Sequence, residues 1–570
     1  MEIFGRKTVI FTRFKSVFVA SMFSLMVSYI LMLTDNVIAG QIVGDDAVAS
    51  MTLIFPIFTL IIFVSYVISD GLGMMVSYAN GHGDSEEVDR LFSLGMILAV
   101  GTSAFFFTAL FFLREEILAF WEISPHLQVY AHEYYDGLKY LTLFVFVDVF
   151  LYTIFVAKGM ENECVKASVA SFVTNVALDI ILCQKMGVMG VGLGTSLGYF
   201  ASTIVLGFYL LRSDLHFVWY WDTKKAWKGI VYSTYHSVDT LCLSILPVML
   251  SYTVIKFFGE GDLIIVTVAV NLLTLIMAMY TGIIDCLQPM ICQYHAEKNL
   301  HSVIKTMRVG ISVTIVMNLI MTVLGMIFAN LLPTFFGVKE AALVEKAAVA
   351  MRFFLPFTTF LGVTLMFTNY YIYIEKLNFG AAIKILLLLI LPAVGMLIGA
   401  QFTMNIFWLA IGATFAVSFV ANRLLTRFYQ KSSNLLLIDG KELARQLSYD
   451  VDASAEEILA LTKKVDADLT RLGVADKTRS KLVLFIEEFG LHAAERAGEN
   501  IFQLEFSILL GEKDSATLII RDNGEPYDVI KTAEEGQFSF REFFIEGVTA
   551  NITSHNYLAN GDENRVVLKI

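Results

Sequence analysis

The stretch LMLTDNVIAGQIVGDDAVAS, residues 31–50, places Asp35 near the end of an apolar run that begins at about residue 16. A bilayer core of about 30 Å requires about 20 apolar residues per helix, so this run predicts a membrane-spanning helix. An ionised carboxylate inside such a helix costs at least ~2.5 kcal/mol. The position of Asp35 therefore predicts either a wet cavity beside it or a neutral side chain.

The rest of the chain contains further apolar stretches of the same length. Of its 570 residues, 56% are hydrophobic and 16% charged, and the mean hydropathy is +0.67, which excludes an ordinary soluble domain. The basic, apolar start is interpreted as an uncleaved first helix rather than a signal peptide. Twelve stretches have spanning length: 16–39, 48–76, 91–113, 138–158, 165–183, 187–211, 236–258, 263–288, 309–336, 349–373, 377–400 and 404–424.

Basic residues gather in alternate loops, and the positive-inside rule places those loops in the cytoplasm. We therefore predict a multi-pass protein of the inner (plasma) membrane with both termini cytoplasmic. The basic residues that carry this prediction are Arg6, Lys7, Arg13, Lys15, Lys158, Lys166, Arg212, Lys224, Lys225, Lys228, Lys298, Lys305, Arg308, Arg423, Arg427 and Lys431.

An internal repeat relates the two halves. Gly44 and Gly259 are 215 positions apart, as are Asp70 and Asp285, in similar local contexts. Six spans per half give both halves the same orientation, which is typical of parallel-repeat transporters with a central cleft. The predicted fold class is an all-α polytopic membrane protein of twelve helices in two parallel-repeat lobes, followed by a soluble α/β sandwich domain. The predicted boundaries are 1–217, 218–434 and 435–570.

Spans five and six contain polar residues that could lie beside Asp35. In SFVTNVALDIILCQKMG, Asn175 and Asp179 are four residues apart and share one helix face. In GVMGVGLGTSLGY, closely spaced glycines permit helix approach, and Thr195 offers a hydroxyl.

LTDNVIAGQIVGDDAVAS, SYANGHGDSEEVDR and NVALDIILCQKMGVMGVGLGTSL together resemble the multidrug and toxic compound extrusion (MATE) family over about residues 10–430. The resemblance implies a proton- or sodium-coupled antiporter that exports amphipathic, often cationic, organic compounds. It also implies an ion site in the first lobe, to which Asp35, Asn175, Asp179 and Thr195 correspond.

The chemistry of these four residues leaves two ions open. Carboxylates, an amide and a hydroxyl offer oxygen ligands to sodium, whereas two close carboxylates in a low-dielectric site can share a proton. The structural alternative is that they only order the helix bundle through hydrogen bonds. Asp70 and Asp285 are interpreted as solvated helix ends, with gating as the alternative. Asp239, with His236 nearby, is interpreted as structural, like the five scattered cysteines.

The chain changes character after about residue 435. From residue 436 onward there are 25 Asp and Glu against 15 Lys and Arg, so the acidic tail is predicted to be a separate soluble body that does not bind nucleic acid. Residues 454–473 and 477–498 have the pattern of amphipathic helices, and IFQLEFSILL, SATLIIRDNG and ENRVVLKI that of strands.

The tail resembles the histidine-kinase-like (GHKL) ATPases, closest to the anti-sigma-factor kinase branch, through KLVLFIEEFGLHAAERA and LIIRDNGEPYDV. The resemblance implies an ATP and magnesium site whose corresponding positions are Glu488, His492, Asp522, Gly524 and Gly547. His492 stands where the family has asparagine and is a poor ligand for magnesium. A degenerate domain that binds a cytoplasmic protein partner is therefore favoured over a nucleotide sensor and an active kinase.

The leading hypothesis is a monomeric secondary efflux transporter, not an enzyme, that acts on a small organic substrate in the lipid bilayer and carries a regulatory tail. Two alternatives remain open: a membrane receptor or scaffold that relays ligand binding through its tail, and an exporter of a lipid-linked envelope precursor.

Overall fold

The computed structural model describes residues 8–120, 125–335, 340–430, 435–497, 501–512, 515–527, 554–560 and 563–570. Within these residues, twelve helical stretches are long and apolar enough to cross a membrane. Each overlaps one of the twelve predicted spans, so that prediction is confirmed. Gly44 and Gly259, the repeat-related glycines, have positive φ angles of 124° and 105°. Gly44 directly precedes α2, and Gly259 is separated from α11 by the short 3-10 helix Glu260–Asp262.

The first lobe is built from eight α-helices, of which α5 and α6 together form the fourth span. Their bounds are α1 (Val9–Ile42), α2 (Asp45–His82), α3 (Ser85–Phe112), α4 (Arg114–Phe120), α5 (Pro125–Leu138), α6 (Thr142–Ala157), α7 (Glu161–Met186) and α8 (Val188–Leu210).

The second lobe repeats the arrangement with more interrupted helices, and a short π-helical segment, Leu386–Ile390, joins α16 to α17. Its helices are α9 (Thr223–His236), α10 (Val238–Phe257), α11 (Leu263–Ala296), α12 (Leu300–Ile327), α13 (Leu331–Phe335), α14 (Ala341–Phe354), α15 (Thr358–Tyr373), α16 (Leu377–Ile385), α17 (Leu391–Gly399) and α18 (Met404–Gln430).

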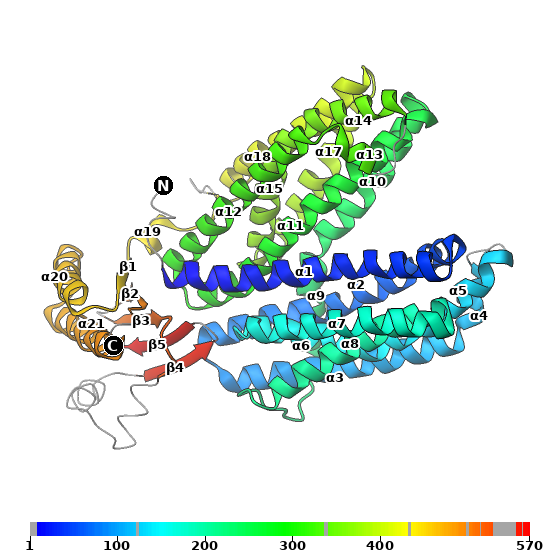
Figure 1. Cartoon of the computed structure of the whole chain (residues 1–570). Coiled ribbons are helices and arrows are strands. Elements are labelled where there is room, and N and C mark those ends of the chain that lie inside the picture. Colours follow the sequence, from blue (N-terminus) through cyan, green and yellow to red (C-terminus); the bar gives the residue numbers. More distant parts are fainter. Residues whose placement is uncertain are drawn as a thin grey trace.

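The two lobes form a V. They converge beside the C-terminal tail and diverge away from it (Figure 1). Helices α1 and α2 make most of the contacts of the first lobe with α9, α11 and α12 of the second, and Glu87 of α3 adds an ion pair with Lys225 of α9. We call the membrane end near the tail the tail side and the opposite end the far side.

The contacts between the lobes include close backbone approaches on the tail side. The Gly71 N–H of α2 donates to the Ser233 hydroxyl of α9, and Gln288 of α11 donates to the Asp70 carbonyl at 3.1 Å. A Cβ atom at Gly81 would lie 2.4 Å from the Gln293 carbonyl oxygen. The lobes are therefore packed without room for added side-chain atoms there.

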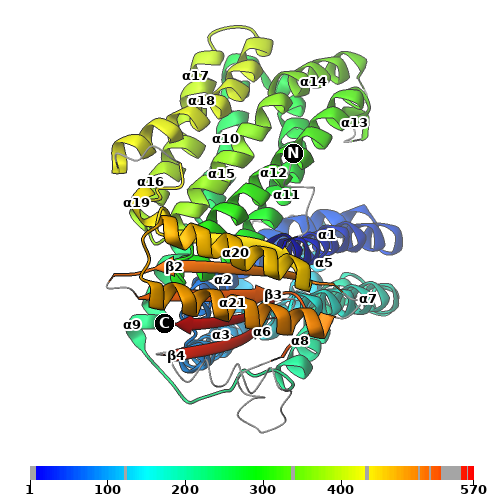
Figure 2. The ribbon, with the colours of Figure 1, turned by 90° about the vertical axis from the view of Figure 1, so that its left-hand side faces the viewer.

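The tail contains a five-stranded antiparallel sheet of order β1-β2-β3-β5-β4. Helices α20 and α21 cover one face, and the opposite face lies against the membrane helices (Figure 2). The predicted soluble body thus has its own sheet and core. Its elements are α19 (Gly440–Leu443), β1 (Gln446–Asp452), α20 (Ala455–Arg471), α21 (Asp476–Ala497), β2 (Gln503–Leu510), β3 (Ala516–Asp522), β4 (Ser554–Asn560) and β5 (Glu563–Lys569).

Glycine in α8 sets the close approach of α7 and α8. A Cβ atom at Gly194 would lie 1.9 Å from Oδ1 of Asp179 and 3.0 Å from its backbone nitrogen. Gly207, on the same helix, has no neighbour within 4 Å of the corresponding position. Gly194 is therefore tightly packed against α7, whereas Gly207 has space for a side chain.

We predict that Gly194→Ala destabilises the protein by about 1–3 kcal/mol, because the helices must separate to admit the methyl group. Gly207→Ala is the matched control and should be neutral or stabilising by about 0.5 kcal/mol. Thermal unfolding of the purified variants in one detergent measures both. Equal midpoints for the two variants would contradict this packing argument.

Candidate ion-coupling site

The four residues that the sequence singles out lie together in the first lobe, although they come from three helices. Asp35 is on α1, Asn175 and Asp179 are on α7, and Thr195 is on α8. Asp35 lies about 33 Å along α1 from Arg13 at the tail side, at 1.5 Å per residue. The cluster therefore occupies the far-side half of the lobe, where the two lobes diverge.

Thr195 is the centre of the hydrogen-bonding pattern. Its hydroxyl accepts from the Asn175 amide at 3.2 Å and can donate to Oδ2 of Asp35 at 3.1 Å. The carbonyl of Val191, at 3.2 Å, competes for the same proton. One hydroxyl proton cannot satisfy both acceptors fully, so Asp35 is held by a shared hydrogen bond.

Within the part of the chain that the structure describes, four oxygens of the cluster have no hydrogen-bond donor. They are Oδ1 of Asp35, Oδ1 of Asn175 and both carboxylate oxygens of Asp179. All three side chains are more than nine-tenths buried, and Asp179 is fully inaccessible to water. Buried carboxylate oxygens are normally satisfied, because desolvating them without a partner is costly. The cluster thus has donor atoms to offer a small cation or a proton.

The two carboxylates interact electrostatically with each other. Two negative charges so close in a low-dielectric interior repel strongly. A proton shared between them, or a cation bound among the oxygens, would remove that repulsion. Among the described residues, no group of three His, Cys, Asp or Glu side chains is placed to hold a metal ion, so a sodium site would depend on the amide and hydroxyl oxygens as well.

The structure adds neighbours that the sequence analysis missed. Tyr134 of α5 interacts electrostatically with Asp35 and Asp179. Tyr199 of α8 interacts with Asp35 and also with Asp148 of α6. Asp148 is buried and is the only acidic residue of TLFVFVDVFLYTIFVA, so the argument applied to Asp35 would have found it.

The second lobe also contains a buried polar cluster, but in this cluster a lysine of the protein pairs with the carboxylate. Lys384 of α16 is fully buried and lies 3.3 Å from Oδ2 of Asp239. Asn369 of α15 joins them: it donates to Asp239 at 2.9 Å and accepts from Lys384 at 2.8 Å. This pairing fits the interpretation of Asp239 as a structural residue. Helices α16–α18 contain no acidic residue.

Asp70 and Asp285 are not solvated helix ends, so that interpretation is wrong. Asp70 is 18% exposed and lies 3.6 Å from the ring of His236, across the boundary between the lobes. Asp285 is half-buried and interacts with Asp70 and Asp239. The packing of α2 against α9 and α11 encloses both side chains, which the sequence pattern did not reveal.

The tail places its predicted nucleotide positions on two elements. Glu488 and His492 are on α21, where the His492 ring stacks on Tyr527 with centroids 5.4 Å apart. The Asp522 carboxylate accepts from the Gly524 N–H at 2.9 Å and from the Asn564 amide at 2.8 Å, and burial raises its pKa. Gly547 lies outside the described residues. Asp522, the predicted adenine-reading residue, thus already has internal partners.

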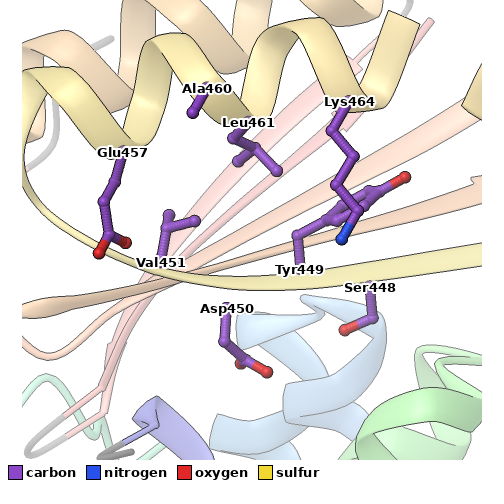
Figure 3. A pocket seen from close by; sticks show the side chains of 8 residues that line it. All are labelled: Ser448, Tyr449, Asp450, Val451, Glu457, Ala460, Leu461 and Lys464. Carbon is purple, nitrogen blue, oxygen red and sulfur yellow. The ribbon is translucent and has the colours of Figure 1, made fainter. Parts of the chain in front are cut away.

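A surface hollow of ≈ 340 Å³ lies elsewhere on the tail, between β1 and α20 (Figure 3). Its lining contains none of the predicted nucleotide residues. Lys464 lies over the ring of Tyr449, 5.4 Å from its centroid. The residues that line the hollow are Ser448, Tyr449, Asp450, Val451, Glu457, Ala460, Leu461 and Lys464.

Twelve spans in two equivalent lobes, with a polar cluster buried in one of them, define a polytopic membrane protein of the transporter class. The MatE family model matches residues 20–181 and 237–398, one segment in each lobe. The chain belongs to the MatE family.

Individual relatives agree with this assignment. The probable multidrug resistance protein NorM of Pseudomonas syringae pv. tomato is 27% identical over 194 residues, which are 33% of this chain and 42% of NorM. This chain therefore matches less than half the length of that curated relative.

Solved structures of similar fold are likewise transporters. An outward-facing multidrug resistance MATE transporter of the MOP superfamily matches with a TM-score of 0.67 and 17% identity, over 74% of this chain and 96% of that chain. A MOP superfamily transporter from Pyrococcus furiosus matches with a TM-score of 0.66 and 17% identity, over 75% and 98%. At these identities the likeness establishes a shared fold.

We predict that Lys384→Met destabilises the protein by about 3–5 kcal/mol, because it leaves Asp239 buried without a cation. Adding Asp239→Asn should recover most of this loss. Thermal unfolding of the single and double variants provides the measurement.

Lys346→Met is the matched control, because Lys346 pairs with Asp262 at 2.8 Å but is 55% exposed. It should change stability by about 0–1 kcal/mol. If the double variant were as unstable as Lys384→Met alone, the charge-pairing explanation would be wrong.

Proposed function

We propose that the protein is a secondary efflux transporter that exchanges an amphipathic or cationic organic compound for a proton or sodium ion bound at Asp35, Asn175, Asp179 and Thr195. The observation that carries this proposal is the set of four donorless oxygens in a buried cluster. Membership of the MatE family and the match to a multidrug resistance protein support export of organic compounds.

The charge of the cluster supplies the coupling. Without a cation, Asp35 and Asp179 repel each other and attract a positively charged substrate toward the first lobe. A bound proton or sodium ion removes one unit of that negative charge. An ion can drive transport only if it favours a different conformation from the substrate or excludes it, so ion binding in this lobe would release the exported compound.

The direction of transport follows from the proposed topology. The positive-inside rule places the tail side in the cytoplasm. A molecule with lobes that diverge on the far side is then outward-facing, like the MATE transporter noted above. In that state an external ion could reach the first lobe, and rocking of the lobes would return the site to the cytoplasm.

The tail is proposed to be a regulatory body. Its internally satisfied Asp522 and the histidine at position 492 support a domain that no longer turns over ATP. Calorimetry of the full-length protein with ATP and magnesium distinguishes this domain from a nucleotide sensor, for which heat of binding is expected.

We predict that Asp35→Asn and Asp179→Asn each abolish ion-driven accumulation of a fluorescent organic cation in proteoliposomes. The reason is that a neutral amide has no negative charge to attract a cation and cannot bind and release a proton. Separately imposed pH and sodium gradients show which ion drives wild-type transport. Counterflow in the same vesicles separates a transporter from a receptor, which would bind the compound without accumulating it.

Asp136→Asn is the matched control. Asp136 is a carboxylate of α5 in the same lobe, but Arg114 and Lys139 pair with it at 2.6 and 2.9 Å. Transport should persist in this variant. Unchanged gradient-driven transport in both Asp35→Asn and Asp179→Asn would remove the proposed coupling site.

A further inference from the structure

The face of the tail sheet that turns toward the membrane helices contains a row of four charged residues. Asp450, Glu505, Arg521 and Arg565 stand directly opposite one another on β1, β2, β3 and β5. The alternate residues, such as Phe506 and Ile520, face the core under α20 and α21. A sheet face of this composition would normally be exposed to water, yet Glu505 and Arg521 are fully buried.

The order of charges along this row is two negative residues followed by two positive residues. Like charges directly opposite each other destabilise a sheet, so Asp450 and Glu505 repel each other, as do Arg521 and Arg565. The isolated tail therefore has two unfavourable cross-strand pairs on this face. Within the sheet, Arg521 pairs with Glu505 at 3.1 Å and with Glu563 at 2.9 Å, which offsets part of this repulsion. Further opposite charge comes from outside the sheet.

The membrane helices provide those two charges in the matching order. Lys305 of α12 lies 2.8 Å from Asp450 and 3.0 Å from Glu505. Glu297, at the end of α11, pairs with both Arg521 and Arg565. Each like-charge pair thus shares one opposite charge from the second lobe, which makes the sheet face and the membrane domain electrostatically complementary.

The same sheet also binds the first lobe. Arg565 donates to the Asn80 carbonyl at 2.7 Å and to the Gly81 carbonyl at the end of α2, where the helix dipole favours a cation. Glu563 of β5 pairs with Arg13 of α1 at 2.6 Å, and both side chains are buried. One hydrogen-bonded sheet therefore joins α1 and α2 of the first lobe to α11 and α12 of the second.

We propose that this charged sheet face is a latch whose binding partner is the tail side of the transporter's own two lobes. While it is docked, the lobes cannot separate on that side, and the molecule stays closed toward the tail. Opening to the opposite state requires the sheet to leave at least one lobe. The latch rests on the proposed function only in that the lobes rock.

The charges of the latch persist over the physiological range. Burial by itself would raise the pKa of Glu505, but Lys305 and Arg521 lower it to about 2. Burial likewise opposes ionisation of Glu563, and Arg13 and Arg521 lower its pKa below the ordinary value. Such lowered values stabilise docking at any pH above the ordinary pKa of 4.5, and the contribution is lost only as the pH falls toward the docked value. Release at neutral pH therefore needs a competing ligand or partner.

Two native cysteines provide a direct test. Cys286 of α11 is fully buried where the lobes meet, with its sulfur 3.8 Å from the Phe14 carbonyl of α1. Cys164 of α7 is equally buried, but its contact, the Tyr152 carbonyl at 3.7 Å, lies within the first lobe. Separation of the lobes on the tail side should expose Cys286 and leave Cys164 protected.

The experiment measures alkylation by N-ethylmaleimide in full-length proteins that retain only Cys286 or only Cys164. Arg565→Ala and Glu297→Gln should speed the alkylation of Cys286 by at least about tenfold, because each breaks the buried ion pair between Arg565 and Glu297 that holds the sheet to the second lobe. Arg565→Lys should give an intermediate rate, since lysine keeps the charge but not the planar fork. Arg479→Ala is the matched control: Arg479 is a tail arginine paired with Asp466 and Asp476 of the tail itself.

The latch is wrong if Cys286 reacts at the wild-type rate in monodisperse Arg565→Ala and Glu297→Gln proteins. It is also wrong if Cys164 accelerates in parallel, which would mean general loosening. Should Arg565→Ala fail to fold, the shape-conserving Glu297→Gln variant carries the test. The alkylation measurement does not depend on transport. Latch variants made in Asp35→Asn protein should therefore show the same acceleration of Cys286 alkylation, even if Asp35 proves not to bind the coupling ion.

Discussion

The cost of burying a charge away from water is the constraint on which this structure depends. The chain meets it in two ways. At Asp35 and Asp179 the carboxylates are buried without a Lys or Arg partner among the described residues, whereas Glu505 and Arg521 each have partners of opposite sign. The first arrangement is suited to an exchangeable ion, and the second to a stable contact.

The two lobes show the same contrast. They share a repeat and a fold, but the first lobe buries Asp35 and Asp179 beside each other without a Lys or Arg partner among the described residues. In the second lobe, Lys384 supplies a permanent charge to Asp239, which removes the reason for a small cation to bind there. The equivalence of the lobes in shape therefore coexists with a difference in buried charge, to which Lys384 contributes.

The tail adds a domain with its own sheet to a membrane fold, and the outward-facing MATE structure matches 74% of this chain. Its sheet lies against the end where the lobes meet, and its charges match those of both lobes. Because of this position, any separation of the lobes at that end would change the contacts of the tail. Under the proposed latch, a ligand or protein that binds the tail would act by competing with Lys305 and Glu297 for the sheet face.

The sequence by itself determined the twelve spans, the two-lobe repeat and the candidate cluster. Apolar length and the 215-residue spacing are local or periodic properties of the chain, and a carboxylate in a spanning helix is conspicuous in any context. The same reasoning would have found Asp148, which was overlooked. Among the cluster residues, the spacing of Asn175 and Asp179 follows from helix geometry alone.

The tertiary structure alone decided which charges meet. Asp70 and Asp285 look like solvated helix ends in the sequence, but the packing of the two lobes encloses them. The charged sheet face has the alternation of an exposed surface, and only the docking of the tail buries it. Contacts such as that between Arg13 and Glu563 join residues 550 positions apart, and no local pattern encodes such a pairing, because it depends on how separately folded parts come together.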